Sequence, residues 1–327
     1  MSPVTPDAWG RSEGARDEGE GGGDSGWKRA LGLFLFTVGA SVVNPLVLMA
    51  VPFVLLVAVL PAKRAGLVAA GLVAVLFVVG SGPTEGMWYL ERGWAVLVGG
   101  WFLGLSLRWP KSRFFPRALG AVGGAFAVAA LLFRVQPGSW RTVDWLVTSR
   151  MRAQAAEIFS AFRLLGGGEG VSPELSDAVY RTVETQGVVF PALLGLASVA
   201  ALGVAWWFWV RLGQEGRSGL LPLGEFRFND QLVWIFVLGL ALVLLGSSGP
   251  WDRLGTNTVV FMGALYALRG AGVLFFLNGG ISLGGGLLLA LAFVFVAPVM
   301  LGGAVVVGLG DTWLDLRTKA RAAAESE

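Results

Sequence analysis

The sequence contains no cysteine and no histidine. Their absence excludes disulfide bonds, thiol nucleophiles, zinc or haem sites with Cys or His ligands, and catalytic triads that use histidine. Charge is also scarce, because only 14% of the residues are charged, against roughly 25% in soluble domains. A formal net charge of +3 is too small to indicate nucleic-acid binding. We therefore expect no cofactor, no catalytic activity and no nucleic-acid partner.

Apolar residues dominate the composition instead. They make up 55% of the chain, the mean hydropathy is +0.68, and there are 14 tryptophans. Such a surface can face lipid, and tryptophan is enriched where a membrane meets water. We predict an integral, multi-pass protein of the cell membrane whose main partner is the lipid bilayer.

The apolar runs are far longer than barrel strands, and lipid-exposed backbone must satisfy its own hydrogen bonds. The predicted fold is therefore all-α, a polytopic transmembrane bundle of about eight helices with an amphipathic helical loop. The expected crossings are residues 30–60, 65–79, 93–107, 118–133, 188–210, 231–245, 256–277 and 284–309.

The chain reads as one transmembrane domain, residues 28–321, between two tails. Residues 1–27 are acidic and rich in glycine, without apolar periodicity, and predict a disordered tail. Residues 322–327 form a short C-terminal tail.

The first apolar run, residues 30–60, is long for one crossing and is interrupted at Asn44-Pro45. It predicts either one tilted, kinked helix or a tight hairpin of two short pieces, because proline removes a backbone donor. Broken helices at membrane depth often line a site. Asn44 is therefore a candidate ligand-binding residue, although a simple proline kink would also explain the pattern.

An amphipathic loop occupies about residues 135–187. Apolar side chains recur there at helical spacing, which predicts a helix lying on the membrane surface. Gly166-Gly167-Gly168 is expected to end it, and Ser172-Pro173-Glu174 is typical of a new helix start, which we expect to run to about Thr185. The loop could also form a lid over a membrane pocket. The apolar stripe of the first helix consists of Trp140, Val143, Val147, Met151, Ala155, Ile158, Phe162 and Leu165.

The distribution of basic residues between the two sides of the membrane does not agree with this list of crossings. The basic loops at 63–64, 108–117 and 211–227 fall on one side, which the positive-inside rule makes cytoplasmic. The same count places the C-terminal Arg317 and Lys319 on the other side. Either those residues do not contribute, or one crossing in the second half is miscounted, and we favour a miscount.

Arg269 is the strongest candidate for chemistry, because it lies inside an apolar segment where a lone arginine is costly. It could bind the head of an anionic ligand together with Asn44, or form half of a buried ion pair. Gly270 beside it would allow close helix contact and belongs to the same candidate ligand-binding set. Asp311 and Asp315 are the nearest acidic residues on its C-terminal side.

Asp311 and Asp315 are four residues apart and would share a helical face if the helix continued. They could hold Mg²⁺, but no full metal-dependent transferase motif surrounds them, and a solvated helix end is the simpler interpretation. We group Asp311, Asp315 and Arg317 as candidates for a partner contact or an ion pair, and we predict no metal site.

Short motifs of a few fixed residues lie at 189–194, 221–228, 231–234, 265–270 and 308–317. Together they resemble the YybS-like predicted membrane proteins, the family with domain of unknown function 2232. The resemblance covers residues 30–321 and implies a helical bundle similar to the substrate-capture (S) components of energy-coupling-factor vitamin transporters. It further implies a small ligand and a partner module that supplies ATP hydrolysis, since this chain contains no P-loop.

Three functions are compatible with these features. The first is a membrane component that binds or transports a small molecule, without enzymatic activity. The second is a membrane scaffold that docks partners through the amphipathic helix and the C-terminal tail. The third is an intramembrane enzyme using Asp311 and Asp315. We favour the first, in which Arg269, Asn44 and the amphipathic loop would form the site and its cover, and we place the third last.

Overall fold

A computed structural model describes residues 22–61, 64–79, 86–165, 172–213, 220, 222–246, 249–278 and 283–325. Within these ranges the protein is entirely helical, with no strand, which confirms the predicted all-α class. The α-helices are α1 (Gly22–Ala40), α2 (Pro45–Val59), α3 (Arg64–Val79), α4 (Gly86–Arg108), α5 (Phe114–Val135), α6 (Ser139–Leu165), α7 (Pro173–Gly213), α8 (Val233–Leu245), α9 (Pro250–Leu277), α10 (Leu283–Leu314) and α11 (Leu316–Glu325). Two short 3-10 turns, η1 (Leu223–Glu225) and η2 (Asp230–Leu232), lie between α7 and α8.

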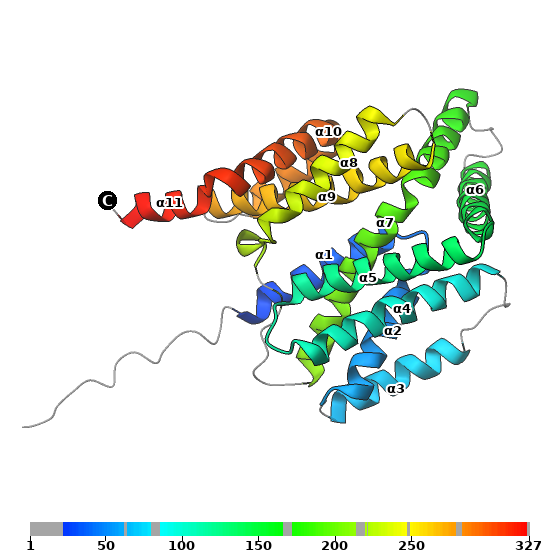
Figure 1. The fold of residues 1–327 in the computed structure, drawn as a ribbon, viewed down its shortest axis with the longest axis horizontal. Coiled ribbons are helices and arrows are strands. Elements are labelled where there is room, and N and C mark those ends of the chain that lie inside the picture. The colour runs from blue at the N-terminus through cyan, green and yellow to red at the C-terminus, as the bar shows by residue number, and fades with distance from the viewer. Residues whose placement is uncertain are drawn as a thin grey trace, which may run out of the picture.

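The helices form two groups that share α7 (Figure 1). α2, α3, α4 and α5 lie on one side of it, and α8, α9, α10 and α11 lie on the other. α7 packs against α1, α2 and α9 and has further contacts with α3, α4, α5 and α6. It is therefore the element around which the whole bundle is built.

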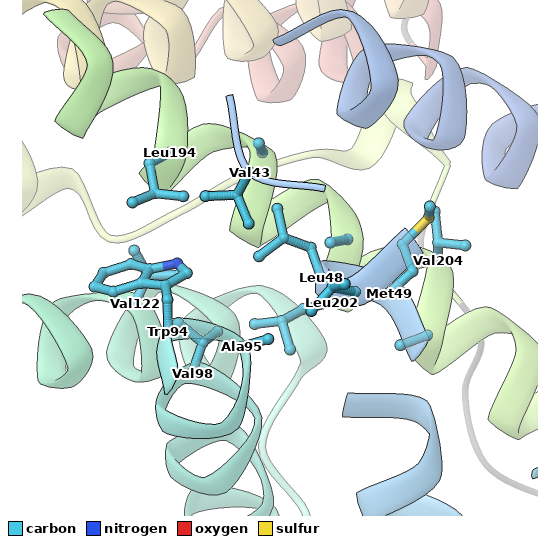
Figure 2. Packing of buried hydrophobic residues seen from close by; sticks show 14 of the residues in the cluster. Val43, Leu48, Met49, Trp94, Ala95, Val98, Val122, Leu194, Leu202 and Val204 are labelled. Carbon is cyan, nitrogen blue, oxygen red and sulfur yellow. The ribbon is translucent and has the colours of Figure 1, made fainter. Parts of the chain in front are cut away.

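The first group is held by an apolar core between α2, α4, α5 and α7 (Figure 2). Small residues such as Ala95 and Ala197 are wholly buried and let the helices approach closely. Larger side chains fill the space between them, among them Val43, Leu48, Met49, Trp94, Val98, Val122, Leu194, Leu202 and Val204.

α7 is a single helix of 41 residues, or about 61 Å at 1.5 Å per residue. That is twice the roughly 30 Å of a bilayer's hydrocarbon core. The predicted helix that starts near Ser172 is confirmed, but its expected end at Thr185 is wrong, because it continues without a break into the predicted crossing at 188–210.

Pro191 nevertheless interrupts the backbone hydrogen bonds of one turn of α7, and side chains of α9 replace the lost hydrogen-bond partners. We call this the opened turn. Proline has no N–H, so the Gly187 carbonyl loses its helical donor. Arg253 donates to that oxygen from Nη2 at 2.8 Å. Asn257 accepts from the Ala192 amide at 2.9 Å and donates to the Val188 carbonyl at 2.9 Å. The opened turn thus fixes where α9 docks on α7.

Arg253 also connects this joint to α6. Its Nη2 is 2.6 Å from Asp144 Oδ1, and its guanidinium carbon lies 4.9 Å from the centre of the Trp140 ring. The Trp140 ring stacks on Phe190 of α7, with centroids 5.7 Å apart. One arginine therefore holds α6, α7 and α9 together.

α6 confirms the predicted amphipathic helix. Val147, Met151 and Ala155 of the predicted stripe are buried, and α6 packs on α7. The side chains of Ile158, Phe162 and Leu165, from the same stripe, are not among those described. Residues Gly166-Gly167-Gly168 also lie outside the described part of the chain. A position on the membrane surface stays a prediction.

Residues 30–60 form two helices rather than one. Residues 41–44 separate α1 from α2, and the two helices pack mainly on other elements, so they are neither one kinked helix nor a tight hairpin. Asn44 is the N-cap of α2, and its side chain accepts from the Leu46 amide at 3.0 Å.

Four described helical segments are long and apolar enough to cross a membrane: Phe114–Val135, Ser176–Leu212, Pro250–Leu277 and Phe295–Leu314. Three more, Pro45–Val59, Arg64–Val75 and Asp230–Leu245, are apolar but shorter. The predicted count of eight crossings is not reproduced by these lengths, because several apolar runs form helices below full membrane thickness.

The two ends differ slightly from the predicted tails. Residues 1–21 of the predicted N-terminal tail lie outside the described part, and α1 already begins at Gly22. At the other end α11 continues to Glu325, into the predicted tail at 322–327.

Candidate functional site

α9 and α10 touch backbone to backbone where two glycines meet. A Cβ added to Gly270 would overlap the Ala304 carbonyl oxygen, and one added to Gly308 would overlap the Tyr266 carbonyl oxygen. Only hydrogen fits at these positions. The contact confirms the close packing predicted at Gly270 and sets the neighbouring side chains of the two helices against each other.

Arg269 lies beside this contact and is completely buried. Its Nε donates to Asp311 Oδ2 at 3.0 Å, and its Nη1 donates to Asp230 Oδ1 at 2.6 Å. Its guanidinium carbon lies 5.4 Å from the centre of the Phe228 ring. The buried ion pair that was one of the two alternatives for Arg269 therefore exists, with Asp311 rather than Asp315 as the acid, and Asp230 supplies a second carboxylate.

Arg317 joins the same cluster from α11. Its Nη2 donates to Asp311 Oδ2 at 3.0 Å and to the Phe226 carbonyl at 3.0 Å, and its Nη1 donates to the Gly224 carbonyl at 2.7 Å. Asp311 thus lies between two arginines with no exposed side-chain surface. We call Asp230, Arg269, Asp311 and Arg317 the arginine–aspartate cluster.

The charges of the cluster balance, since two arginines face two aspartates. Burying an unpaired charge costs several kcal/mol, so mutual neutralisation is what makes the site tolerable inside the bundle. The members differ in exposure. The Arg269 and Asp311 side chains are inaccessible, whereas the Asp230 side chain is 50% exposed.

Several buried polar atoms around the cluster lack a hydrogen-bond partner. They are Arg269 Nη2, Asp311 Oδ1 and Arg317 Nε, whereas the Tyr266 hydroxyl is hydrogen-bonded to Thr312. Buried polar groups are usually satisfied, so atoms without a protein partner gathered at one place could bind a small ligand. They offer both donors and an acceptor.

Asp311 and Asp315 would share a face only if the helix continued, and it does not. α10 ends at Leu314, and Asp315 has a φ of 45°, in the left-handed region. Its side chain is 47% exposed, and its carboxylate turns to Arg227, with Oδ1 and Nη2 3.0 Å apart. The favoured interpretation of a solvated helix end therefore holds for Asp315, whereas Asp311 is buried.

Asn44 belongs to a different part of the fold. Its backbone amide donates to Glu91 Oε1 of α4 at 3.2 Å, and its side chain caps α2. Among the described residues, no hydrogen bond or ion pair links it to the arginine–aspartate cluster. The structure therefore does not bring Asn44 together with Arg269 and Gly270.

Asp230, Phe228 and Tyr266 were missed by the sequence reasoning. Asp230 lies in a loop that also contains Glu225 and Arg227, so its residue type carries no signal. The one signal in the sequence was that Asp230 directly precedes an apolar run. An acid at the end of a membrane segment can reach an arginine buried in a neighbouring segment.

The contacts of Arg317 also settle the orientation problem. Loop residues Gly224 and Phe226 bind Arg317, and Arg227 faces Asp315, so the C-terminal basic residues lie on the same side as the loop at 211–227. The count that placed them on opposite sides is wrong.

The physical reason lies within α10. Its backbone departs from helical geometry at Val296, two residues before Pro298, so α10 consists of two helical parts. Arg269 of α9 meets Asp311 near the end of α10, and Arg321 of α11 lies 5.1 Å from the centre of the Phe276 ring near the end of α9, so α9 and α10 both finish at the same end of the bundle. The part before Val296 therefore has to return along α9, and residues 284–309 are not one simple crossing.

Comparison with protein families gives a match over most of the chain. The family model described as predicted membrane protein (DUF2232) matches residues 30–312. The chain belongs to this family. No significant match was found among curated proteins or among solved structures.

Most of the arginine–aspartate cluster of this DUF2232 protein lies within the matched region. The matched region includes Asp230, Arg269 and Asp311 but ends before Arg317. The family description states a membrane protein and no activity, so the chemistry of the site has to be argued from its own residues.

Proposed function

We propose that this DUF2232 protein is a multi-pass component of the cell membrane that binds or transports a small molecule at the arginine–aspartate cluster. The observation that carries the proposal is the set of three unsatisfied polar atoms on Arg269, Asp311 and Arg317. A ligand with a negatively charged head and a hydrogen-bond donor would satisfy them. No catalytic step is part of the proposal.

Asp230 is the group that such a ligand would replace. It is the cluster's one half-exposed carboxylate and comes from a 3-10 turn rather than a long helix. When it leaves, the remaining three residues carry one net positive charge next to the free Nη2 of Arg269. A carboxylate or phosphate would then restore the balance that burial requires.

The basic residues suggest which side carries the site. The cluster lies at the end of the bundle that holds the loop after α7 and helix α11, with Arg227, Lys319 and Arg321 nearby in sequence. By the positive-inside rule this end faces the cytoplasm. Similarity to substrate-capture components, with a partner module supplying ATP hydrolysis, is part of the same proposal.

The test is ligand-dependent stabilisation of the purified protein in mild detergent. Thermal unfolding is followed with a panel of small carboxylates and phosphates for the wild type and for Asp230→Asn and Arg269→Lys. We expect Asp230→Asn to strengthen the stabilisation by anions, because the competing carboxylate is gone, and Arg269→Lys to weaken it. Equal responses of all three proteins would refute the site.

A second candidate function, a membrane scaffold, is favoured by α11. Its Lys319 and Arg321 are exposed beside the cluster, so a partner protein with an acidic surface could dock there. Co-purification of a stoichiometric partner that is lost in Lys319→Glu but unaffected by Arg269→Lys would support this alternative.

A further inference from the structure

A groove runs along the outer face of α4, away from the arginine–aspartate cluster. It has a volume of about 590 Å³. Gly100 and Gly104 create it, because they are four residues apart on one helical face, and a Cβ at either would meet no atom within 4 Å. Its lining consists of Val96, Leu97, Gly100, Trp101, Gly104, Leu105, Arg108 and Trp109.

Trp101 forms a fixed wall of the groove. Its ring lies against Gly124 of α5, where an added Cβ would approach Trp101 Cδ2 to 2.8 Å. Any side chain at that position would displace the ring. The groove is therefore shaped by packing between α4 and α5.

The groove opens at one end into a basic and aromatic hollow of about 430 Å³, which shares Arg108 and Trp109 with it. Lys111 and Ser112 complete this hollow. Arg108, Lys111 and Arg113 are exposed, and within the described part of the chain none of them makes an ion pair. α5 begins next to it at Phe114, with no side chain bonded to its first amides, and such a helix start favours anions.

We propose that this surface is a binding site for one anionic phospholipid. An acyl chain lies along Gly100 and Gly104, and the phosphate is held by Arg108 and Lys111. Thirteen residues from Val96 to Arg108 correspond to about 18 Å of helix, close to the roughly 15 Å of one leaflet's hydrocarbon. Trp109 lies at the junction, where tryptophan meets the headgroup level.

The apolar length of the groove decides between a lipid and a free phosphate ion. A free anion would use the hollow at Arg108 and Lys111 alone and would gain nothing from Val96 or Leu97. The unpaired positive charges favour an anionic lipid over a zwitterionic one, because they would repel the positive group of a zwitterionic headgroup.

Native mass spectrometry of the full chain in mild detergent tests the site. The protein is titrated with phosphatidylglycerol and, separately, with phosphatidylcholine of the same acyl chains. The variants are Arg108→Gln/Lys111→Gln and Gly104→Leu. The matched controls are Arg134→Gln/Arg141→Gln, two exposed basic residues elsewhere, and Gly123→Leu, an exposed helical glycine whose Cβ also meets no atom.

We expect one phosphatidylglycerol to bind more tightly than the rest, with about fivefold weaker binding for each basic residue removed. Gly104→Leu fills the groove and abolishes preferential binding of that lipid, while both controls bind as the wild type. Equal affinity for phosphatidylcholine, displacement by inorganic phosphate, or an equal loss in the controls would overturn the proposal. The proposal would also be overturned if the protein were a dimer that Gly104→Leu converts to a monomer without changing lipid binding. In that case a second copy of the chain, and not a lipid, would occupy the groove.

Discussion

Arg269 and Asp311 are 42 positions apart in sequence and lie against each other across α9 and α10, with Nε 3.0 Å from Oδ2 and neither side chain exposed. The glycine contact beside Arg269 makes this approach possible, because Gly270 and Gly308 leave no side chains between the two backbones. Charge pairing and close backbone packing therefore depend on each other.

Removing the negative charge at Asp311 should destabilise the protein strongly. In Asp311→Asn two buried arginines would share the single carboxylate of Asp230, and breaking a buried pair costs about 3–5 kcal/mol. We expect a loss of that order in the free energy of unfolding, measured by denaturant titration in mixed micelles. Asp315→Asn is the control: its side chain is 47% exposed, so it should cost less than about 1 kcal/mol. Comparable losses would contradict the assignment of the buried pair to Asp311.

The backbone contact between α9 and α10 should not tolerate a methyl group. Gly270→Ala forces a Cβ into the Ala304 carbonyl oxygen, so the helices must separate, at a cost of about 3 kcal/mol or more. Gly263→Ala, in the same helix, meets only Phe236 Cε2 at 4.0 Å and should be neutral or slightly stabilising, because alanine favours helix. Thermal unfolding in detergent distinguishes the two variants, and equal midpoints would argue against the contact.

The opened turn of α7 predicts an energetic coupling between Pro191 and Asn257. Asn257→Ala leaves the Ala192 amide without its acceptor and removes one donor to the Val188 carbonyl, at about 1–3 kcal/mol for a buried unsatisfied group. In Pro191→Ala the helical ladder can close, so the same asparagine change should cost less. A double-mutant cycle should give a coupling of about 1 kcal/mol or more; simple additivity would show that the asparagine does not repair the turn.

Glu174 in the first turn of α7 should titrate below its ordinary range. Its carboxylate accepts from its own backbone amide and from the Ser172 side chain, and both hydrogen bonds lower the pKa of Glu174. Because the folded pKa is depressed, the stability that this group contributes is present above the unfolded pKa and is lost as pH falls through the folded one. Carbon NMR of labelled glutamate should show the low pKa, and Ser172→Ala should raise it. An unchanged value in Ser172→Ala would exclude the hydroxyl as a cause.

Much of the candidate site was predictable because burying a lone arginine has a known cost. Arg269 stands alone in an apolar segment, so a nearby acid was required, and Asp311 was one of two candidates. The choice between Asp311 and Asp315 depended on where α10 ends, and the left-handed φ of Asp315 that turns it toward Arg227 leaves no pattern in the sequence. Asn44 was wrongly expected to lie at the site for a related reason. A polar residue that interrupts an apolar run can cap a helix as well as contact a ligand, and the sequence does not distinguish the two roles.

The sequence by itself determined that the protein is helical and lies in a membrane. Composition and the length of the apolar runs leave no other way to satisfy the backbone in lipid, and the apolar stripe at residues 140–165 was sufficient to predict α6. Only the tertiary structure decided which segments are separate helices and that the C-terminal helix lies beside the loop before α8. The continuous α7, the return within α10 at Val296 and the meeting of Asp230 with Arg269 all result from contacts between residues far apart in the chain, and the energy of such contacts cannot be read from local periodicity.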